Sequence, residues 1–151
     1  MVVNAARWCN TIVTELELSV GVEAAARILQ VCGRDCAHRS GVVGRLPSQG
    51  AHSIAELYAS LHSIIPDLVE LDRGELYITY PRCFCSLVQE RLAVTPHLHC
   101  ECSVGWIKAV CAAASPLPVD VELLQSVIRG ADRCHFRVRL AVPENATDET
   151  P

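Results

Sequence analysis

The sequence predicts an α+β fold in which N-terminal helices pack on an antiparallel sheet that ends in a C-terminal β-hairpin. Two observations lead to this expectation. Apolar residues recur at helical spacing from Ala5 to about Ile65, and again from Ser103 to Ala114. The segments 68–80 and 119–140 have the pattern of paired strands around turn residues. Helices followed by a hairpin, a helix and a second hairpin are typical of an α+β domain.

Length and composition favour a single unit. The chain has 151 residues, half of them hydrophobic and a fifth charged, which suits one core. With only two Phe, two Trp and three Tyr, that core must be largely aliphatic. We expect one domain over residues 1–142 and a disordered tail over 143–151, where Glu, Thr and Asp predominate.

Three helices are expected in the first half of the chain. The first covers residues 5–18, and Ser19 can cap a second over residues 21–40. A third follows the capping residue Ser53 and runs to Ile65 before a proline. The side chains expected on the apolar faces of the first two helices are Trp8, Ile12, Val13 and Leu16, then Ala25, Ile28, Leu29, Cys32 and Cys36.

Two hairpins are expected in the second half. One joins Leu68–Leu71 to Glu75–Tyr80, where side chains alternate between two faces. The other joins 119–128 to 133–140, with Cys134, Phe136, Val138 and Leu140 facing inward. If its turn centres on Gly130, Ser126 lies across from Cys134, with Cβ atoms about 5 Å apart.

Charge and segment patterns exclude several functions. A net charge of −4 without a clustered basic face argues against nucleic acid. No apolar run reaches the roughly 18 residues of a membrane helix, and the N-terminus lacks the pattern of a secretory signal. We therefore expect a cytoplasmic protein whose nine cysteines are thiols or ligands rather than disulfides.

Five of the six cysteines between Tyr77 and Leu140 suggest a metal site: Cys83, Cys85, Cys100, Cys102 and Cys134. Zinc, the usual ion of sulfur-rich cytoplasmic sites, takes four tetrahedral ligands. One cysteine from each Cys-x-Cys pair and Cys134 can supply three, and His97, His99, Glu101 or a water the fourth. Thiolates also suit another soft transition metal. Cys32 and Cys36, four residues apart on a helix, can point at one ion or pack as small apolar side chains.

The same residues suggest an alternative in which a thiolate is the nucleophile. Cys100 and Cys102 fall at the start of a helix, whose partial positive charge lowers a thiol pKa. A thiolate or a metal-bound water would attack an electrophilic carbon while a histidine or Glu101 moves the proton. The candidate catalytic residues are Cys83, Cys100, His99 and Glu101. The candidate substrate-pocket residues are Cys36, Trp106 and Ser126.

The C-terminal half also resembles known families. The segments Ile78-Thr-Tyr-Pro-Arg-Cys-Phe-Cys, His99-Cys-Glu-Cys and Ser126-Val-Ile-Arg-Gly-Ala-Asp-Arg-Cys-His-Phe-Arg are similar to motifs of the L-2-amino-thiazoline-4-carboxylic acid hydrolase family. By this resemblance Cys83 matches the first family cysteine, Cys100 or Cys102 the second, and Cys134 the third. The resemblance implies hydrolysis of a small cyclic compound at a C–N or C–S bond.

The terminal hairpin resembles a second family, the vinyl-reductase-type small-molecule-binding domain, in which cysteines and a glutamate hold zinc. Cys100 and Cys134 match two of those ligands, and Ser126 stands where the third would be. This resemblance implies a sensor-like binding domain instead of an enzyme.

The prediction is therefore a small cytoplasmic hydrolase-like enzyme that acts on a small cyclic C–N/C–S compound through a cysteine-rich metal or thiolate site. The alternative is a zinc-containing, non-catalytic small-molecule-binding domain. The expected cofactor is zinc, and the expected partner is a small organic molecule, with no nucleic acid and no membrane. A homodimer is among the assemblies that the sequence allows.

Overall fold

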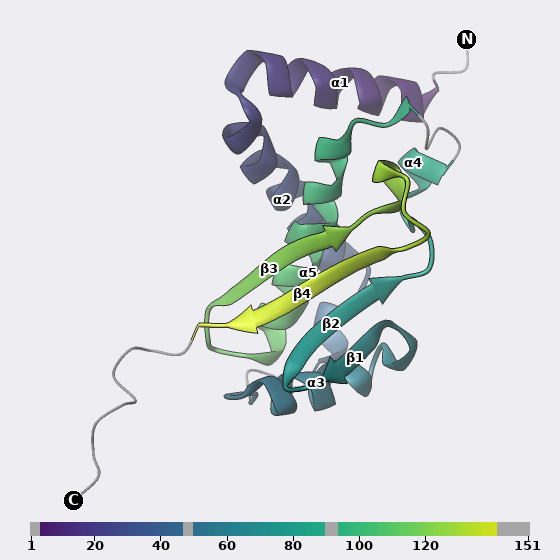
Figure 1. The fold of residues 1–151 in the computed structure, drawn as a ribbon. Coiled ribbons are helices and arrows are strands. Elements are labelled where there is room, and N and C mark those ends of the chain that lie inside the picture. Colours follow the sequence, from purple (N-terminus) through teal and green to yellow (C-terminus); the bar gives the residue numbers. More distant parts are fainter. Residues whose placement is uncertain (1–3, 47–49, 90–93, 142–151) are drawn as a thin grey trace, which may run out of the picture.

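A computed structural model describes residues 4–46, 50–89 and 94–141 (Figure 1). It confirms the predicted α+β fold class, with helices packed against a four-stranded antiparallel sheet. The predicted disordered tail lies outside the described residues.

The helices form close to their predicted positions. They are α1 (Ala5–Val20), α2 (Val22–Arg39), α3 (Ile54–His62), the short α4 (Ser86–Gln89) and α5 (Cys100–Ala114). Asn4 caps α1 by accepting from the backbone N–H of Arg7, and Ser53 caps α3 as predicted. The predicted cap Ser19 is wrong, because Ser19 lies inside α1. Gly21, at φ +80°, separates α1 from α2.

Both predicted hairpins are present. They are formed by β1 (Val69–Asp72) with β2 (Glu75–Tyr80), and by β3 (Val119–Gln125) with β4 (Cys134–Leu140). The strand order is β1-β2-β4-β3, so β4 pairs with both β3 and β2 and joins the two hairpins into one sheet. The second hairpin is shorter than predicted, because Val127–Arg129 forms a 3₁₀ turn, η5, instead of continuing the strand.

The sheet has one covered and one open face. Figure 1 shows α5 crossing behind the strands, with α2 next to α5 and α1 across one end of the molecule. Leu76, Ile78 and Phe136 are buried against Ile107 of α5 in the hydrophobic core. The opposite face is polar, and its ion pairs link Arg137 to Glu75 and Glu122.

Helices α2 and α5 cross with their backbones in contact. A Cβ atom added to Gly33 would lie 1.8 Å from the carbonyl oxygen of Cys102, and one added to Gly105 would lie 2.1 Å from that of Gln30. Beside the crossing, Gln30 donates to Glu101 at 2.8 Å. Only glycine permits this approach, so the crossing fixes α5, which carries the predicted site residues Cys100, Glu101, Cys102 and Trp106.

Candidate functional site

The first turn of α5 and the residue before it contain four predicted site residues, but these point in different directions. Successive side chains on a helix are rotated by about 100°. His99 Nδ1 is 4.0 Å from the Sγ of Cys9 on α1. Cys100 Sγ is 3.0 Å from the Oγ of Ser126, whereas Glu101 accepts from Gln30 on α2. The candidate nucleophile and the candidate proton carriers thus face three different parts of the fold.

Three cysteines lie near enough for their charges to affect one another, and we call them the sheet-side thiol group: Cys83, Cys100 and Cys134. Cys134 and Cys100 are buried. Burial raises the pKa of the Cys83 and Cys100 thiols, and the nearby Cys134 raises both further. Ser126, fully buried, bonds to Cys100 and also accepts from the backbone N–H of Ile128. The hairpin thiol therefore lies near one cysteine from each Cys-x-Cys pair.

The remaining surface and half-buried thiols gather between α1, α2 and the segment that precedes α4. This helix-side thiol group consists of Cys9, Cys32, Cys36, Cys85 and Cys102. Burial raises the pKa of Cys102 to about 12, with smaller contributions from the other four thiols. Cys111 belongs to neither group, because it is fully enclosed in the core and burial raises its pKa to about 12.

The predicted zinc cage is not found among the described residues. Across residues 4–46, 50–89 and 94–141, which include all nine cysteines, no three His, Cys, Asp or Glu side chains are placed to hold a metal ion. One physical reason is that two candidates for the fourth ligand face away from the sheet-side thiol group, since His99 lies against Cys9 and Glu101 accepts from Gln30. The second Cys-x-Cys pair also diverges, because helix positions i and i+2 do not face the same side.

The predicted activation of a thiolate by the N-terminus of α5 is also wrong. The pKa values of Cys100 and Cys102 are raised, and in both cases burial is the largest cause. Burial lowers the pKa of His99, and its Nε2 has no hydrogen-bond partner among the described residues. These shifts keep the thiols protonated and the imidazole neutral near neutral pH, whereas nucleophilic catalysis needs a thiolate.

The three predicted pocket residues belong to different surroundings. Cys36 is exposed on α2 in the helix-side group, and Ser126 bonds to Cys100 on the other side of α5. Trp106 packs edge-on against Tyr80, with ring centroids 6.4 Å apart, at the border of the core. Their assignment to one pocket stays a prediction.

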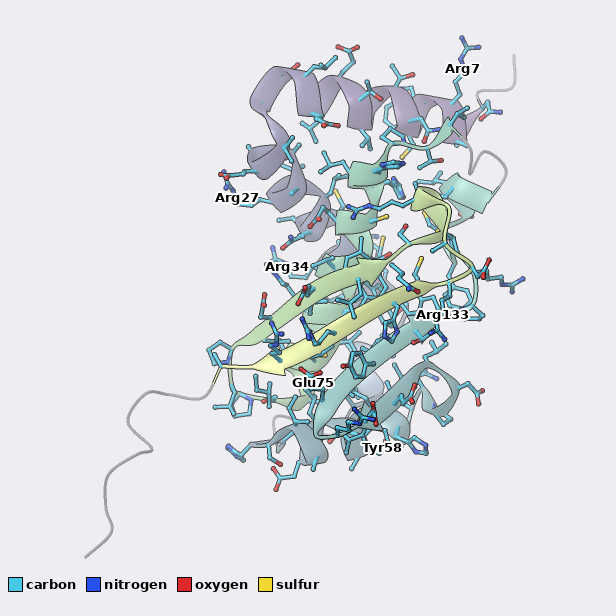
Figure 2. All side chains as sticks on the ribbon, in the orientation of Figure 1. Arg7, Arg27, Arg34, Tyr58, Glu75 and Arg133 are labelled. Atoms are coloured by element: carbon cyan, nitrogen blue, oxygen red, sulfur yellow. The ribbon has the colours of Figure 1, made fainter. Side chains whose placement is uncertain are left out.

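Sequence patterns missed an exposed surface on α2. Ile28, predicted on the inner face, is 44% exposed, and Val31 is 52% exposed. Arg27 and Arg34 flank Val31, and neither makes an ion pair within the described part of the chain. Figure 2 shows Arg27 projecting from α2 away from the body of the molecule. We call Arg27, Ile28, Val31 and Arg34 the α2 outer surface.

A second group of apolar side chains is exposed on α1. Trp8 is 63% exposed and Ile12 is 41% exposed, although both were predicted to face the core. They lie four residues apart on one side of the helix. Among the described helices, none combines the length with the apolar composition required to cross a bilayer.

The architecture defines a class, an α+β domain with two long helices stacked behind a four-stranded antiparallel sheet. Within it, the chain belongs to a family of unknown function, DUF6144, whose family model matches residues 2–145. No curated protein is similar enough in sequence to count as a relative.

A solved structure shares the fold. The chain is similar to a trafficking protein particle complex subunit 3 from Naegleria fowleri, crystallised covalently bound to palmitic acid. The sequence identity is 15%, the TM-score is 0.55, and the match covers 91% of this chain and 93% of that chain. At this identity the likeness concerns the fold.

These findings correct the resemblances drawn from the terminal hairpin. The family that matches nearly the whole chain is neither the thiazoline hydrolase family nor the vinyl-reductase-type domain. The similar solved structure is a trafficking-complex subunit, so the descriptions hydrolase and zinc protein have no support. The hairpin motif misled because an inward-facing alternation of cysteine and aliphatic residues meets the packing needs of any buried strand.

Proposed function

We propose that this chain is a non-catalytic, protein-binding module whose α2 outer surface receives an amphipathic helix of a partner protein. The observation that carries the proposal is a stripe of exposed apolar side chains between unpaired arginines, Arg27 and Arg34, on a helix held rigidly from behind. The raised thiol pKa values support the absence of catalysis.

Apolar burial would drive the association. Ile28 and Val31 lie on neighbouring turns and expose about half of their surface. Burying a side chain of this kind fully is worth about 1.5–3 kcal/mol relative to full exposure. Burial of the exposed half of each side chain therefore contributes about half of that free energy. The contacts that flank the stripe must supply the remaining binding free energy. Because α2 is pinned by the Gly33 crossing, little ordering cost opposes binding.

The arginines define the chemistry of the partner. Arg27 and Arg34 lie about two helical turns apart, on a chain whose net charge is −4. Two unpaired cations beside an apolar stripe complement a helix that carries carboxylates beside its own apolar stripe. An acidic amphipathic helix is therefore the occupant that we propose.

The same arginines disfavour a second copy of this chain as the occupant. A two-fold, antiparallel pairing of α2 centred between Gln30 and Val31 would set Arg27 of one copy opposite Arg34 of the other. Like charges in contact weaken an interface.

The fold supports a protein-binding role, because the similar solved protein is named as a subunit of a complex.

We also infer that the module works in the cytoplasm. Among the described residues, which include all nine cysteines, no disulfide forms, and several of the cysteines are exposed or only partly buried. Thiols persist in this state in a reducing compartment.

The test is binding of two synthetic helical peptides, measured by fluorescence anisotropy. Both carry the same leucine stripe, one flanked by glutamates and the other by lysines. We expect the acidic peptide to bind at least about tenfold more tightly than the basic one. Val31→Glu should weaken it about tenfold or more, whereas Val22→Glu, an equally exposed valine at the start of α2, should not.

The charge requirement has its own test. In the double variant Arg27→Glu and Arg34→Glu, preference should switch to the lysine-flanked peptide. An unchanged preference overturns the proposed partner chemistry. A self-association that Val31→Glu abolishes in sedimentation, or binding to anionic vesicles in place of the acidic peptide, would instead assign this surface to a second copy or to a membrane.

A further inference from the structure

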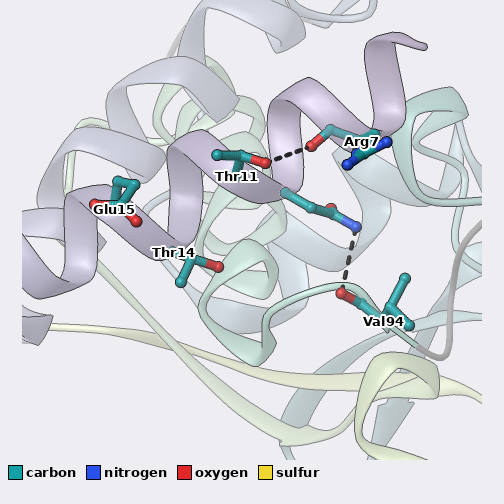
Figure 3. A pocket seen from close by; sticks show the side chains of 6 residues that line it. Arg7, Thr11, Thr14, Glu15 and Val94 are labelled. Carbon is teal, nitrogen blue, oxygen red and sulfur yellow. Dashed lines mark hydrogen bonds between the residues drawn. The ribbon is translucent and has the colours of Figure 1, made fainter.

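An open groove runs along α1 on a side that the proposed function does not use. Its cavity volume is about 250 Å³ (Figure 3). In Figure 3, Arg7 and Glu15 lie towards opposite ends of the groove, with Thr14 between them. The residues that line it are Arg7, Asn10, Thr11, Thr14, Glu15 and Val94.

The groove contains a buried acceptor without a donor. Asn10 is only 9% exposed, and its Nδ2 donates to the carbonyl oxygen of Val94 at 3.3 Å. Its Oδ1 has no hydrogen-bond partner among the described residues. An unsatisfied buried acceptor is costly, and each such group in a folded protein calls for a partner. The amide is thus held at one end by Val94 and offers its oxygen to an N–H or O–H group.

The two ends of the groove carry opposite charges. Arg7 lies in the first turn of α1, where the helix dipole also favours an anion. Glu15 lies eight residues later, about 12 Å along the helix axis. Neither side chain makes an ion pair within the described part of the chain. The groove therefore suits a ligand that is negative at one end and positive at the other.

We propose that the groove binds a short peptide with free termini, about three residues long. The terminal carboxylate pairs with Arg7, a backbone N–H donates to Asn10 Oδ1, and the terminal ammonium pairs with Glu15. The hydroxyl of Thr14 can donate to a backbone carbonyl. An extended chain spans about 3.3–3.6 Å per residue, so three residues cover most of the separation. In a free α-amino acid the two charges are too close together to reach both ends.

The test is isothermal titration calorimetry of the full chain with trialanine. We expect saturable binding with a Kd of roughly 0.1–1 mM, as for a small ligand with few contacts. Arg7→Gln and Glu15→Gln should each weaken binding about tenfold, because each removes one charge-assisted contact at an exposed position. Arg39→Gln and Glu23→Gln, which change the same residue types on α2, serve as controls and should leave the Kd unchanged.

Blocked peptides assign the two ends. N-acetyl-trialanine lacks the ammonium, so it should bind more weakly than trialanine to the wild-type chain and equally to wild type and Glu15→Gln. Trialanine amide should behave in the same way towards Arg7→Gln. No saturable heat up to about 20 mM trialanine, equal binding of blocked and free peptides, or equal loss in the α2 controls would each overturn the proposal.

Discussion

The two faces of α2 differ in a way that reverses the usual arrangement of side chains. The inner face carries small residues and one leucine: Ala25, Leu29, Gly33 and Ala37, all buried. The outer face carries the bulkier apolar side chains of Ile28 and Val31, both about half exposed. Small residues face inward because α5 approaches to backbone contact at Gly33. Size and apolarity alone therefore do not identify the core side of this helix.

The largest expected effect comes from filling the inner face. Gly33→Ala places a Cβ atom 1.8 Å from the Cys102 carbonyl oxygen, and backbone cannot move aside as a flexible side chain would. We expect a loss of more than about 3 kcal/mol, or no folding at all, in urea unfolding followed by circular dichroism. The control is Gly44→Ala, where an added Cβ meets nothing within 4 Å. Equal stability of the two variants would contradict the close crossing.

Thiol reactivity provides a second contrast between the two faces. Cys32 and Cys36 are exposed on α2, whereas Cys102 lies partly covered where α5 meets it. A rise of the Cys102 pKa from an ordinary 9.0 to about 12 lowers its thiolate population at neutral pH about a thousandfold. Iodoacetamide labelling followed by peptide mass spectrometry should modify Cys32 and Cys36 well before Cys102. Early labelling of Cys102 in the folded chain would show that α2 does not shield it.

The pH dependence of stability should come from the buried side. Burial lowers the pKa of His99 in the fold, so the unfolded chain takes up a proton first as pH falls. The contribution of His99 is complete above the unfolded pKa of about 6.5 and is lost as pH falls through the lower folded value. His99→Leu should flatten the dependence of the urea midpoint on pH below about pH 6.5. The opposite result would place the titrating group on the surface.

The smallest expected effect is on the outer face. Val31→Glu should change the free energy of unfolding by no more than about 0.5 kcal/mol, because an exposed helix position tolerates a charge. Leu29→Glu, two residues away but only 7% exposed, should cost several times more because it buries a carboxylate. The pair can be compared by thermal unfolding, and similar losses would mean that both side chains belong to the core.

Much of the fold was accessible from the sequence. Alternation over Glu75–Tyr80 and Cys134–Leu140 identified two strands, and the inward set Cys134, Phe136 and Val138 is buried as predicted. The predicted opposition of Ser126 and Cys134 lies one residue beyond the last pair of the ladder, Gln125↔His135, and stays a prediction. Strand order was not accessible, because the pairing of β2 with β4 depends on how α5 packs the two hairpins together.

The candidate site was harder to predict. A cluster of cysteines in the sequence suggests a metal or catalytic site. Whether the thiols converge depends on the direction in which each helix position points, and Cys100 and Cys102 point to different parts of the fold. Val31 is exposed because Gly33 sets the side of α2 that faces α5. The contact that fixes this orientation joins Gly33 to Cys102, which is distant in the sequence, so no local pattern encodes it. Asn10 gave no signal either, since its importance comes from Val94, 84 residues later.

The position of β4 has a consequence for biosynthesis. Although β4 is the last of the four strands to be synthesised, it occupies the interior of the sheet, between β2 and β3. While a ribosome still holds Cys134–Leu140 in its exit tunnel, the edges of β2 and β3 that pair with β4 have no partner. The backbone N–H and C=O groups on those edges remain open to water or to a chaperone. The helical half can become compact during translation, whereas the sheet can be completed only after β4 has left the exit tunnel.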